Sequence, residues 1–139
     1  MKSYSELVAA GMKRVSNDLS EILASRGFKR VKGGRTWQRS TGAFIEVVHL
    51  QRSGSSYGAP RNASVDLRLM LSVRPKNGEA RGDMVLSSMA RRATGFGYHH
   101  RFNAETGSTY ERCVEELGFY IEEVAEPWFK EQLRASART

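Results

Sequence analysis

The sequence predicts an α+β domain, in which an N-terminal and a C-terminal helix pack on one face of an antiparallel sheet of three to five strands. Three observations favour this class. Apolar residues recur at helical spacing near both ends of the chain, they alternate with polar residues in the middle, and turn-forming residues separate the alternating runs. A chain of 139 residues has the length of one domain, so residues 1–139 are expected to form a single domain.

The first predicted element is a helix from about Ser5 to Ser25. Its apolar residues recur at spacings of four and three and therefore share one helix face: Val8, Met12, Val15, Leu19 and Ile22. Gly27 follows directly, and a glycine ends a helix readily because it adopts the left-handed conformation without strain. Phe28 is then placed to pack back on the last turn.

Residues 28–74 are predicted to form antiparallel strands. The runs FKRV, RTWQRS, AFIEVVHLQR and ASVDLRLMLSVR are separated by Gly-Gly, by Thr-Gly and by the loop SGSSYGAPRN. The last run alternates strictly, which predicts one buried face and an opposite face that carries Asp66, Arg68 and Arg74. Residues 44–50 are apolar at both parities, which predicts a central strand covered on both faces.

Residues 75–107 have a weaker pattern. PKNGEARGD is typical of a charged loop, and DMVLSSMARRA is interpreted as a short helix capped by Asp83. GFGYHHRFNAETG fits either a strand or an ordered loop, and the sequence alone does not separate the two.

The last predicted element is a helix that begins with the capping box STYE, with Ser108 as N-cap and Glu111 at the third helical position. An apolar stripe then recurs at spacings of four and three: Tyr110, Val114, Leu117, Ile121, Val124 and Trp128. Pro127 removes a helical hydrogen bond, so the helix is expected to kink or restart there. The tail is expected to fray from about residue 134.

Charge is distributed unevenly around a net value of +7. Residues 26–52 carry seven basic residues against one acid, whereas residues 105–131 carry eight glutamates against two basic residues. This asymmetry predicts a basic face and an acidic face. The single cysteine, Cys113, and the lack of a signal peptide or a long apolar run favour a cytoplasmic location.

Most of the chain, and residues 27–53 in particular, resembles a family of small bacterial proteins, the domain of unknown function 4304. The residues that carry this resemblance are Gly27, Phe28, Lys29, Arg30, Trp37, Leu50, Gln51, Arg52 and Ser53. The late EPWF segment, Glu126 to Phe129, is also similar to the end of that family. The resemblance implies an α+β fold, and it brings no established activity and no catalytic residue.

The sequence offers little for catalysis, metal binding or cofactor binding. His99 and His100 are adjacent and His49 is far away, so we expect a solvated histidine pair and no metal site. No nucleotide fingerprint or nucleophile elbow is present. A hydrolase remains an alternative only if His49, Asp66 and Cys113 converge in one pocket, since a catalytic base must lie within hydrogen-bond reach.

The candidate site is instead the basic hairpin. Cations that contact phosphates and flat rings that stack on bases are what nonspecific nucleic-acid binding uses. We therefore predict a non-enzymatic binding module that holds an anionic partner, either nucleic acid or an acidic protein. The predicted binding residues are Lys29, Arg30, Lys32, Arg35, Trp37, Arg39, Arg52 and Arg68, with the loop 53–62 beside them. The ordinary alternative is that these cations protect a sheet edge and that Trp37 belongs to the core.

A second hypothesis places the function on the acidic C-terminal helix. The glutamates of this helix, Glu116 and Glu126 included, are expected mainly on its outward face. An immunity or accessory protein would use Glu115, Glu122 and Glu123 to contact a basic protein partner.

Overall fold

The structure, a computed structural model, describes residues 3–32, 34–53, 63–76, 81–86, 95 and 97–137. It begins with helix α1 (Tyr4–Ala24), close to its predicted bounds. The Ser3 side chain accepts a hydrogen bond from the backbone N–H of Glu6 at 3.2 Å, which caps the helix start. Gly27 ends the helical turn with a φ of 90°, and the Phe28 N–H donates to the Leu23 carbonyl at 3.0 Å.

A six-stranded antiparallel sheet follows. Its strands are β1 (Lys29–Arg30), β2 (Thr36–Thr41), β3 (Phe44–Ser53), β4 (Ser64–Pro75), β5 (Arg81–Leu86) and β6 (Arg101–Asn103). The strands pair in the order β1-β2-β3-β4-β5, and β6 pairs with the first three residues of β4. The register places Trp37 opposite Val48 and Val48 opposite Leu71, so residues of one parity line one face across three strands.

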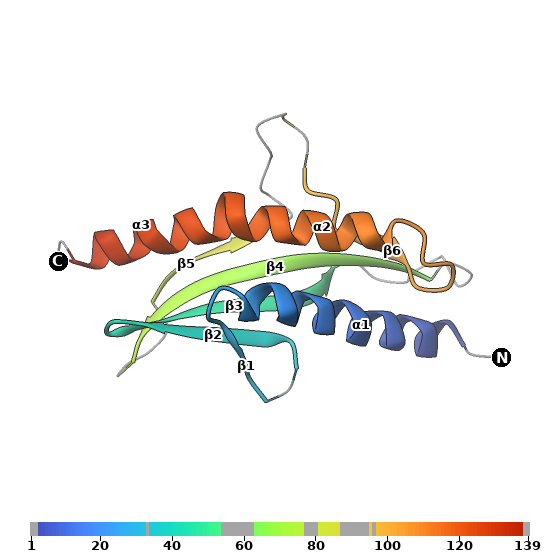
Figure 1. The fold of residues 1–139 in the computed structure, drawn as a ribbon, viewed down its shortest axis with the longest axis horizontal. Helices are drawn as coiled ribbons and strands as arrows, with labels where there is room; N and C mark the ends of the chain where they lie inside the picture. The colour runs from blue at the N-terminus through green and yellow to red at the C-terminus, as the bar shows by residue number, and fades with distance from the viewer. Residues whose placement is uncertain are drawn as a thin grey trace.

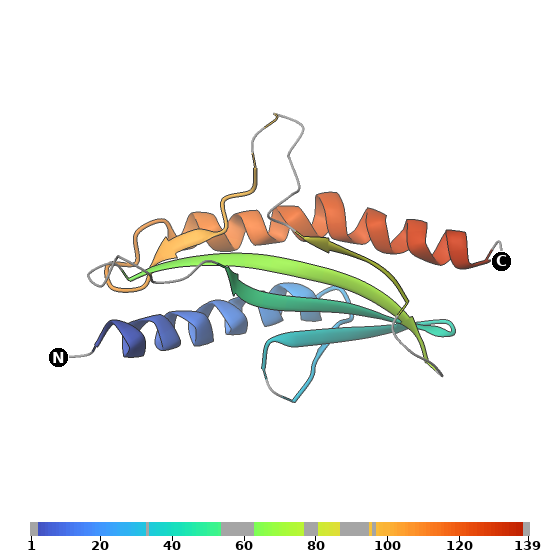
Figure 2. The ribbon, with the colours of Figure 1, turned by 180° about the vertical axis from the view of Figure 1, so that it is seen from behind.

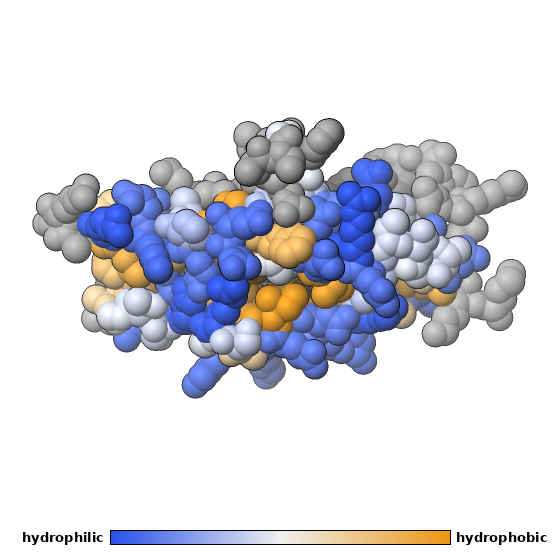
Figure 3. All heavy atoms as spheres, turned by 45° about the horizontal axis from the view of Figure 1, so that its top comes forward, coloured by the Kyte–Doolittle hydropathy of each residue, from blue (hydrophilic) through white to orange (hydrophobic). Residues whose placement is uncertain are grey.

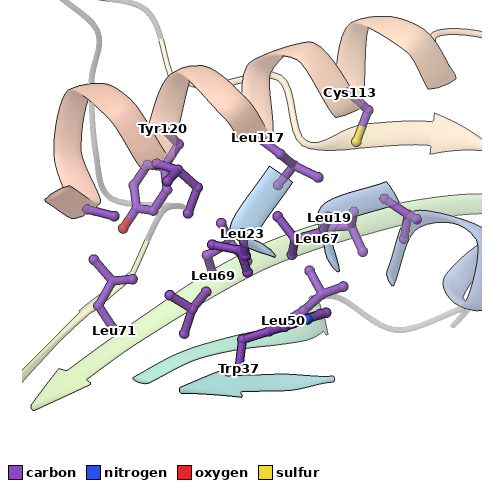
Figure 4. Close-up of a cluster of buried hydrophobic side chains, with 14 of the residues drawn as sticks. Leu19, Leu23, Trp37, Leu50, Leu67, Leu69, Leu71, Cys113, Leu117 and Tyr120 are labelled. Atoms are coloured by element: carbon purple, nitrogen blue, oxygen red, sulfur yellow. The ribbon is translucent and has the colours of Figure 1, made fainter. Parts of the chain in front are cut away.

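Both helices cover this one face, as Figures 1 and 2 show from opposite sides. The β4 residues Val65, Leu67, Leu69, Leu71 and Val73 are all buried, and the residues between them are half-buried. They pack against Leu19 and Leu23 of α1 and against Leu117 and Tyr120 of the C-terminal helix, with Trp37 and Leu50 below (Figure 4). The predicted α+β class and the placement of both helices are confirmed.

Strand β3 differs from its prediction, because the described helices cover only one of its faces. Val48 and Leu50 are fully buried on the helix side together with Glu46, whereas Ile45 and Val47 on the other side are only half-buried. None of the described helices lies on that second face. The apolar character at both parities therefore reflects a central position between two neighbouring strands, and not a second covering layer.

The region after β4 contains a strand where the sequence predicted a helix. Residues 81–86 pair with β4, with Met70 opposite Leu86 and Leu71 opposite Val85. Asp83 lies within this strand and caps no helix there. Residues 87–93 lie outside the described residues. The segment GFGYHHRFNAETG, for which the sequence allowed either a strand or a loop, contains the short strand β6. In this strand Phe102 is buried opposite Val65.

The C-terminal helix has three parts: α2 (Tyr110–Tyr120), the π-helical turn η2 (Ile121–Ala125) and α3 (Glu126–Ala137). Its N-cap is Thr109, with a φ of 64° and no side-chain cap bond, so the predicted cap at Ser108 is one residue early. The restart expected at Pro127 is confirmed, since α-helical geometry resumes at Glu126. The chain stays helical to Ala137, beyond the predicted start of fraying at about 134.

The surface seen with the top of Figure 1 turned forward is mostly hydrophilic (Figure 3). A few hydrophobic residues gather near the middle of this face. No helix within the described residues combines the length and the apolar character needed to cross a membrane.

Candidate anion-binding site

The eight residues predicted to bind a polyanion do not form one surface. They lie on β1 (Lys29, Arg30), on the turn between β1 and β2 (Lys32, Arg35), on β2 (Trp37, Arg39), on β3 (Arg52) and on β4 (Arg68). Trp37, Arg39 and Arg52 belong to the helix-covered side by strand parity, whereas Arg68 is on the opposite side. Each therefore has to be judged from its own contacts.

Trp37 is part of the core. Its side chain is fully buried, and its indole N–H donates to Ser20 Oγ of α1 at 3.1 Å. The Arg30 guanidinium lies 5.6 Å from the ring centroid. The ring has no free face on which a base could stack. The alternative, that Trp37 belongs to the core, is therefore correct.

Arg39 is held inside the fold by two carboxylates. It donates to Glu46 Oε1 at 2.7 Å and to the two Glu126 carboxylate oxygens at 2.5 and 3.0 Å. Burial alone would lower the pKa of the guanidinium, but the hydrogen bonds and charges of Glu126 and Glu46 raise it above its usual value. Its charge is neutralised within the protein, so Arg39 is not available to a phosphate.

Arg52 and Arg68 lie in different surroundings. Arg68 is half-buried on the side away from the helices, and its Nε donates to Gln51 Oε1 at 2.9 Å. The Arg52 Nε is buried, and it has no hydrogen-bond partner among the described residues. A buried N–H without a partner is uncommon, because it loses its hydration and gains nothing in exchange.

Of the remaining predicted cations, Arg30 and Arg35 line a hollow between α1 and the turn that joins β1 to β2, whereas Lys29 and Lys32 lie outside it. We call it the cationic hollow. It has a volume of about 260 Å³ and is lined by Ala9, Met12, Lys13, Ser16, Arg30, Gly34 and Arg35. Three of these residues are cationic and none is acidic. The structure thus brings Arg30 and Arg35 together and adds Lys13 from α1.

Only an indirect sign of Lys13 can be found in the sequence. It follows Met12, a residue of the buried stripe of α1, so it is one position away from the packed face. A residue at that border points either toward a neighbouring element or into solvent. Only the packing of α1 beside β1 decides which.

The cations of the hollow have no carboxylate partner among the described residues. Within the described residues, neither Lys13 nor Arg35 forms an ion pair. In the described part of the chain, Arg30 hydrogen-bonds to neutral groups: its Nε donates to the Gly34 carbonyl and its Nη1 to Asn17 Oδ1, both at 2.8 Å. Unlike Arg39, these side chains have positive charge available for an external anion.

The turn itself is built to hold Arg30 and Arg35 in place. The Val31 N–H donates to the Thr36 carbonyl at 2.8 Å, and the Gly34 N–H donates to the Val31 carbonyl at 3.1 Å. Gly34 has a φ of 90°, a conformation that other residues adopt only with strain. The Leu50 N–H donates to the Arg35 carbonyl at 2.9 Å, which ties the turn to β3.

His49 lies close enough to Arg35 for the charge of Arg35 to affect its pKa. Its Nδ1 is hydrogen-bonded to Thr36 Oγ1 at 2.8 Å. Burial lowers the pKa of His49 below its usual value, and the charge of Arg35 lowers it further. Histidine is therefore neutral here at pH 7, and it adds no charge to the surface.

The three residues of the hydrolase hypothesis do not converge. His49 and Asp66 share one face, but Met70, the partner of His49, is four residues from Asp66, about 13 Å at roughly 3.3 Å per residue. Cys113 is fully buried on the helix side. Burial and the charge of Glu116 raise the pKa of its thiol to about 12, so it is protonated at neutral pH. His49, Asp66 and Cys113 therefore do not form the catalytic constellation of that hypothesis.

The histidine pair is not solvated as predicted. His100 is buried, and its ring contacts Tyr98 and Tyr120 with centroid distances of 5.8 and 5.9 Å. Burial lowers its pKa to about 4, although the Glu116 backbone and charge act in the opposite direction. Residues 98–100 lie beside α2 and are partly covered by it. Among the described residues, no group of three or more metal-ligating side chains is present.

The acidic helix is less uniform than predicted. Glu115, Glu122 and Glu123 are exposed, and Glu123 accepts a hydrogen bond from the Tyr98 hydroxyl at 2.7 Å. Glu116 is buried, where it accepts from the His99 N–H at 2.7 Å. Glu126 is bound to Arg39. Of the five glutamates that were predicted to point outward, Glu116 and Glu126 therefore form hydrogen bonds within the fold instead.

Comparisons of this chain with protein-family models, with curated proteins and with solved structures give no match. The resemblance of residues 27–53 to the domain of unknown function 4304 therefore stays an expectation from the sequence, and the candidate site rests on the geometry of the cationic hollow.

Proposed function

We propose that this protein is a non-enzymatic binding module whose basic surface, centred on the cationic hollow, binds nucleic acid through its phosphates. The observation that supports this most is the meeting of Lys13, Arg30 and Arg35 around one hollow without a lining carboxylate. Exposed Lys29 and Lys32 extend the positive surface along β1 and its turn. Such a surface raises the local concentration of a polyanion and speeds its encounter.

The mode of binding follows from what the surface lacks. With Trp37 buried, no aromatic ring of the described residues lines the hollow, so base stacking does not contribute to affinity there. Contacts to the phosphate backbone position a nucleic acid but carry no sequence information. Binding should therefore be independent of sequence and strongly dependent on salt.

Guanidinium groups bind phosphates, as they bind carboxylates, through planar forks that donate two parallel hydrogen bonds. Two of the three cations in the hollow are arginines. Nucleic acid also presents a regular row of charges, which a patch on an acidic protein does not. We therefore prefer nucleic acid to an acidic protein as the partner.

The test is fluorescence anisotropy of labelled single- and double-stranded DNA and RNA at about 50 and 200 mM salt, a range over which several phosphate contacts cost orders of magnitude in affinity. The double variant Lys13→Ala/Arg35→Ala should bind more weakly, and its salt slope on duplex DNA should fall by about 2, roughly one unit per lost contact.

The matched control is Lys76→Ala/Lys130→Ala, which removes the same charge from two exposed lysines outside the hollow. It should keep the affinity and slope of the unchanged protein. If both double variants lost the same affinity, binding would depend on the overall positive charge of the protein and not on the hollow. No binding at 50 mM salt would reject nucleic acid as the partner.

A further inference from the structure

The cationic hollow is too small for a whole ligand of ordinary size. Small-molecule sites measure about 300–1,000 Å³, whereas the hollow has about 260 Å³ and is partly open. It suits one charged group that is carried by a larger molecule. Ala9 and Met12 form an apolar part of its wall, and a wall of low polarity strengthens the attraction between the cations and an anion inside.

The charge of the hollow identifies that group. Three cations surround it, and within the described residues none of them is paired with a carboxylate. A phosphodiester or a carboxylate brings a single negative charge. A phosphomonoester brings about −1.5 to −2 at pH 7 and three strong acceptor oxygens, which match three cationic donors better.

Arg52 lies near the same turn but is not among the residues that line the hollow. It lies two residues beyond Leu50, whose N–H is bonded to the Arg35 carbonyl, and on the same strand parity as Leu50. Its buried Nε has no hydrogen-bond partner among the described residues.

We propose that the cationic hollow is a subsite for a terminal phosphate, a phosphomonoester such as the phosphorylated end of a nucleic-acid strand. This inference rests on the proposed function, but it adds recognition of an end to binding along the backbone. Lys13, Arg30 and Arg35 hold the phosphate oxygens, and Arg30 is oriented in advance by its bonds to Gly34 and Asn17. Such orientation lowers the cost of ordering the side chain when the phosphate binds.

The test compares four single strands of one sequence at about 150 mM salt: a 5′-hydroxyl strand, a 5′-phosphate strand, a 3′-phosphate strand and a circular strand without ends. Labels are internal, so they block neither end. A phosphorylated end should bind at least about tenfold more tightly than the hydroxyl strand, the effect of one or two additional charge-assisted hydrogen bonds. The circular strand should compete no better than the hydroxyl strand.

The variants separate this subsite from a general loss of charge. Lys13→Ala and Arg35→Ala should each remove the preference for the phosphorylated end, while Lys76→Ala should keep it. Circular dichroism and thermal unfolding confirm that each variant is folded. Arg30→Lys provides a second probe, because it keeps the charge but loses the planar fork, and it should weaken the preference without abolishing binding.

The outcomes distinguish the two proposals. If all four strands bind equally and with steep salt dependence, nucleic-acid binding stands and the terminal-phosphate subsite is overturned. If no strand binds but a nucleoside 5′-monophosphate or inorganic phosphate shifts the backbone resonances of residues 30–35 in a titration followed by nuclear magnetic resonance, the subsite stands for a small phosphate ester and the nucleic-acid function falls. Absence of both effects overturns both.

Discussion

The side chain of Arg39 joins three parts of the chain that are far apart in sequence. It bonds to Glu46 across the β2–β3 hairpin, to the Arg26 carbonyl after α1 and to Glu126 at the start of α3. Its guanidinium also lies 4.3 Å from the centre of the Phe28 ring. Glu46 is almost completely buried and depends on Arg39 and on the Thr41 hydroxyl for its hydrogen bonds.

Replacing Arg39 with methionine should therefore destabilise the fold by about 3 kcal/mol, because it leaves the buried Glu46 carboxylate without its charge partner. Urea unfolding followed by circular dichroism measures the change. Arg35→Met is the control, since Arg35 is exposed and outside any ion pair of the described residues, and it should cost less than about 0.5 kcal/mol. Equal stability of both variants would contradict the role given to Arg39.

His100 makes the fold sensitive to acid. Its pKa in the folded protein is about 4, below the ordinary 6.5 of an unfolded chain, so the unfolded state binds more protons between these values. Stability is complete above pH 6.5 and falls as the pH decreases toward 4, where the loss from this group reaches about 3 kcal/mol.

His100→Gln should show a shallower decline between pH 6.5 and 4 than the unchanged protein. The difference between the two pH profiles of unfolding free energy isolates His100 from the carboxylates that titrate in the same range. Parallel profiles would mean that His100 is protonated without cost in the folded protein.

At the scale of elements, two helical glycines behave differently. A Cβ at Gly11 of α1 would lie 3.0 Å from Phe102 Cε2 and 3.1 Å from Ala104 Cβ, closer than side chains normally approach. A Cβ at Gly118 of α2 would meet only Ile22 Cδ1, at an ordinary 4.0 Å. Gly11 thus allows α1 to pack closely against the β6 region, while Gly118 serves no such purpose.

Gly118→Ala should stabilise the protein by about 0.5–1 kcal/mol, because alanine favours the helix over glycine by about this amount. Gly11→Ala should destabilise it despite the same helical preference, since overpacking typically costs about 1–3 kcal/mol. Thermal unfolding of both variants provides the comparison. A stabilised Gly11→Ala would show that β6 moves aside easily.

The elements that sequence reasoning predicted correctly are those with long local patterns. The stripe of α1 and the alternation in β4 extend over twelve or more residues, so each position is supported by its neighbours. Strand β5 has six residues, and its aspartate resembled a helix cap. The environment of Arg39 was beyond prediction because its partner Glu126 is 87 residues away. The hollow likewise depends on which side of α1 packs beside β1.

At the scale of the whole molecule, Cys113 lies between the C-terminal helix and the rest of the core (Figure 4). Its thiol is fully buried and its pKa is raised to about 12. It should not react with Ellman's reagent at pH 8 unless the helix leaves the sheet. We expect negligible labelling of the folded protein over an hour and complete labelling in concentrated urea, measured by absorbance. Rapid labelling under native conditions would indicate local opening of α2.

The contacts of Arg39 with Glu46 and Glu126 also affect how the chain folds. Arg39 and Glu46 are seven residues apart and can meet as soon as the β2–β3 hairpin forms, whereas Glu126 is added some eighty residues later. Contacts of such sequence separation require a long loop to close first and therefore slow folding. During synthesis, the apolar face of the sheet stays without its second helix until residues 110–137 have left the ribosome. Chaperone dependence of the growing chain should be greatest just before α3 is complete.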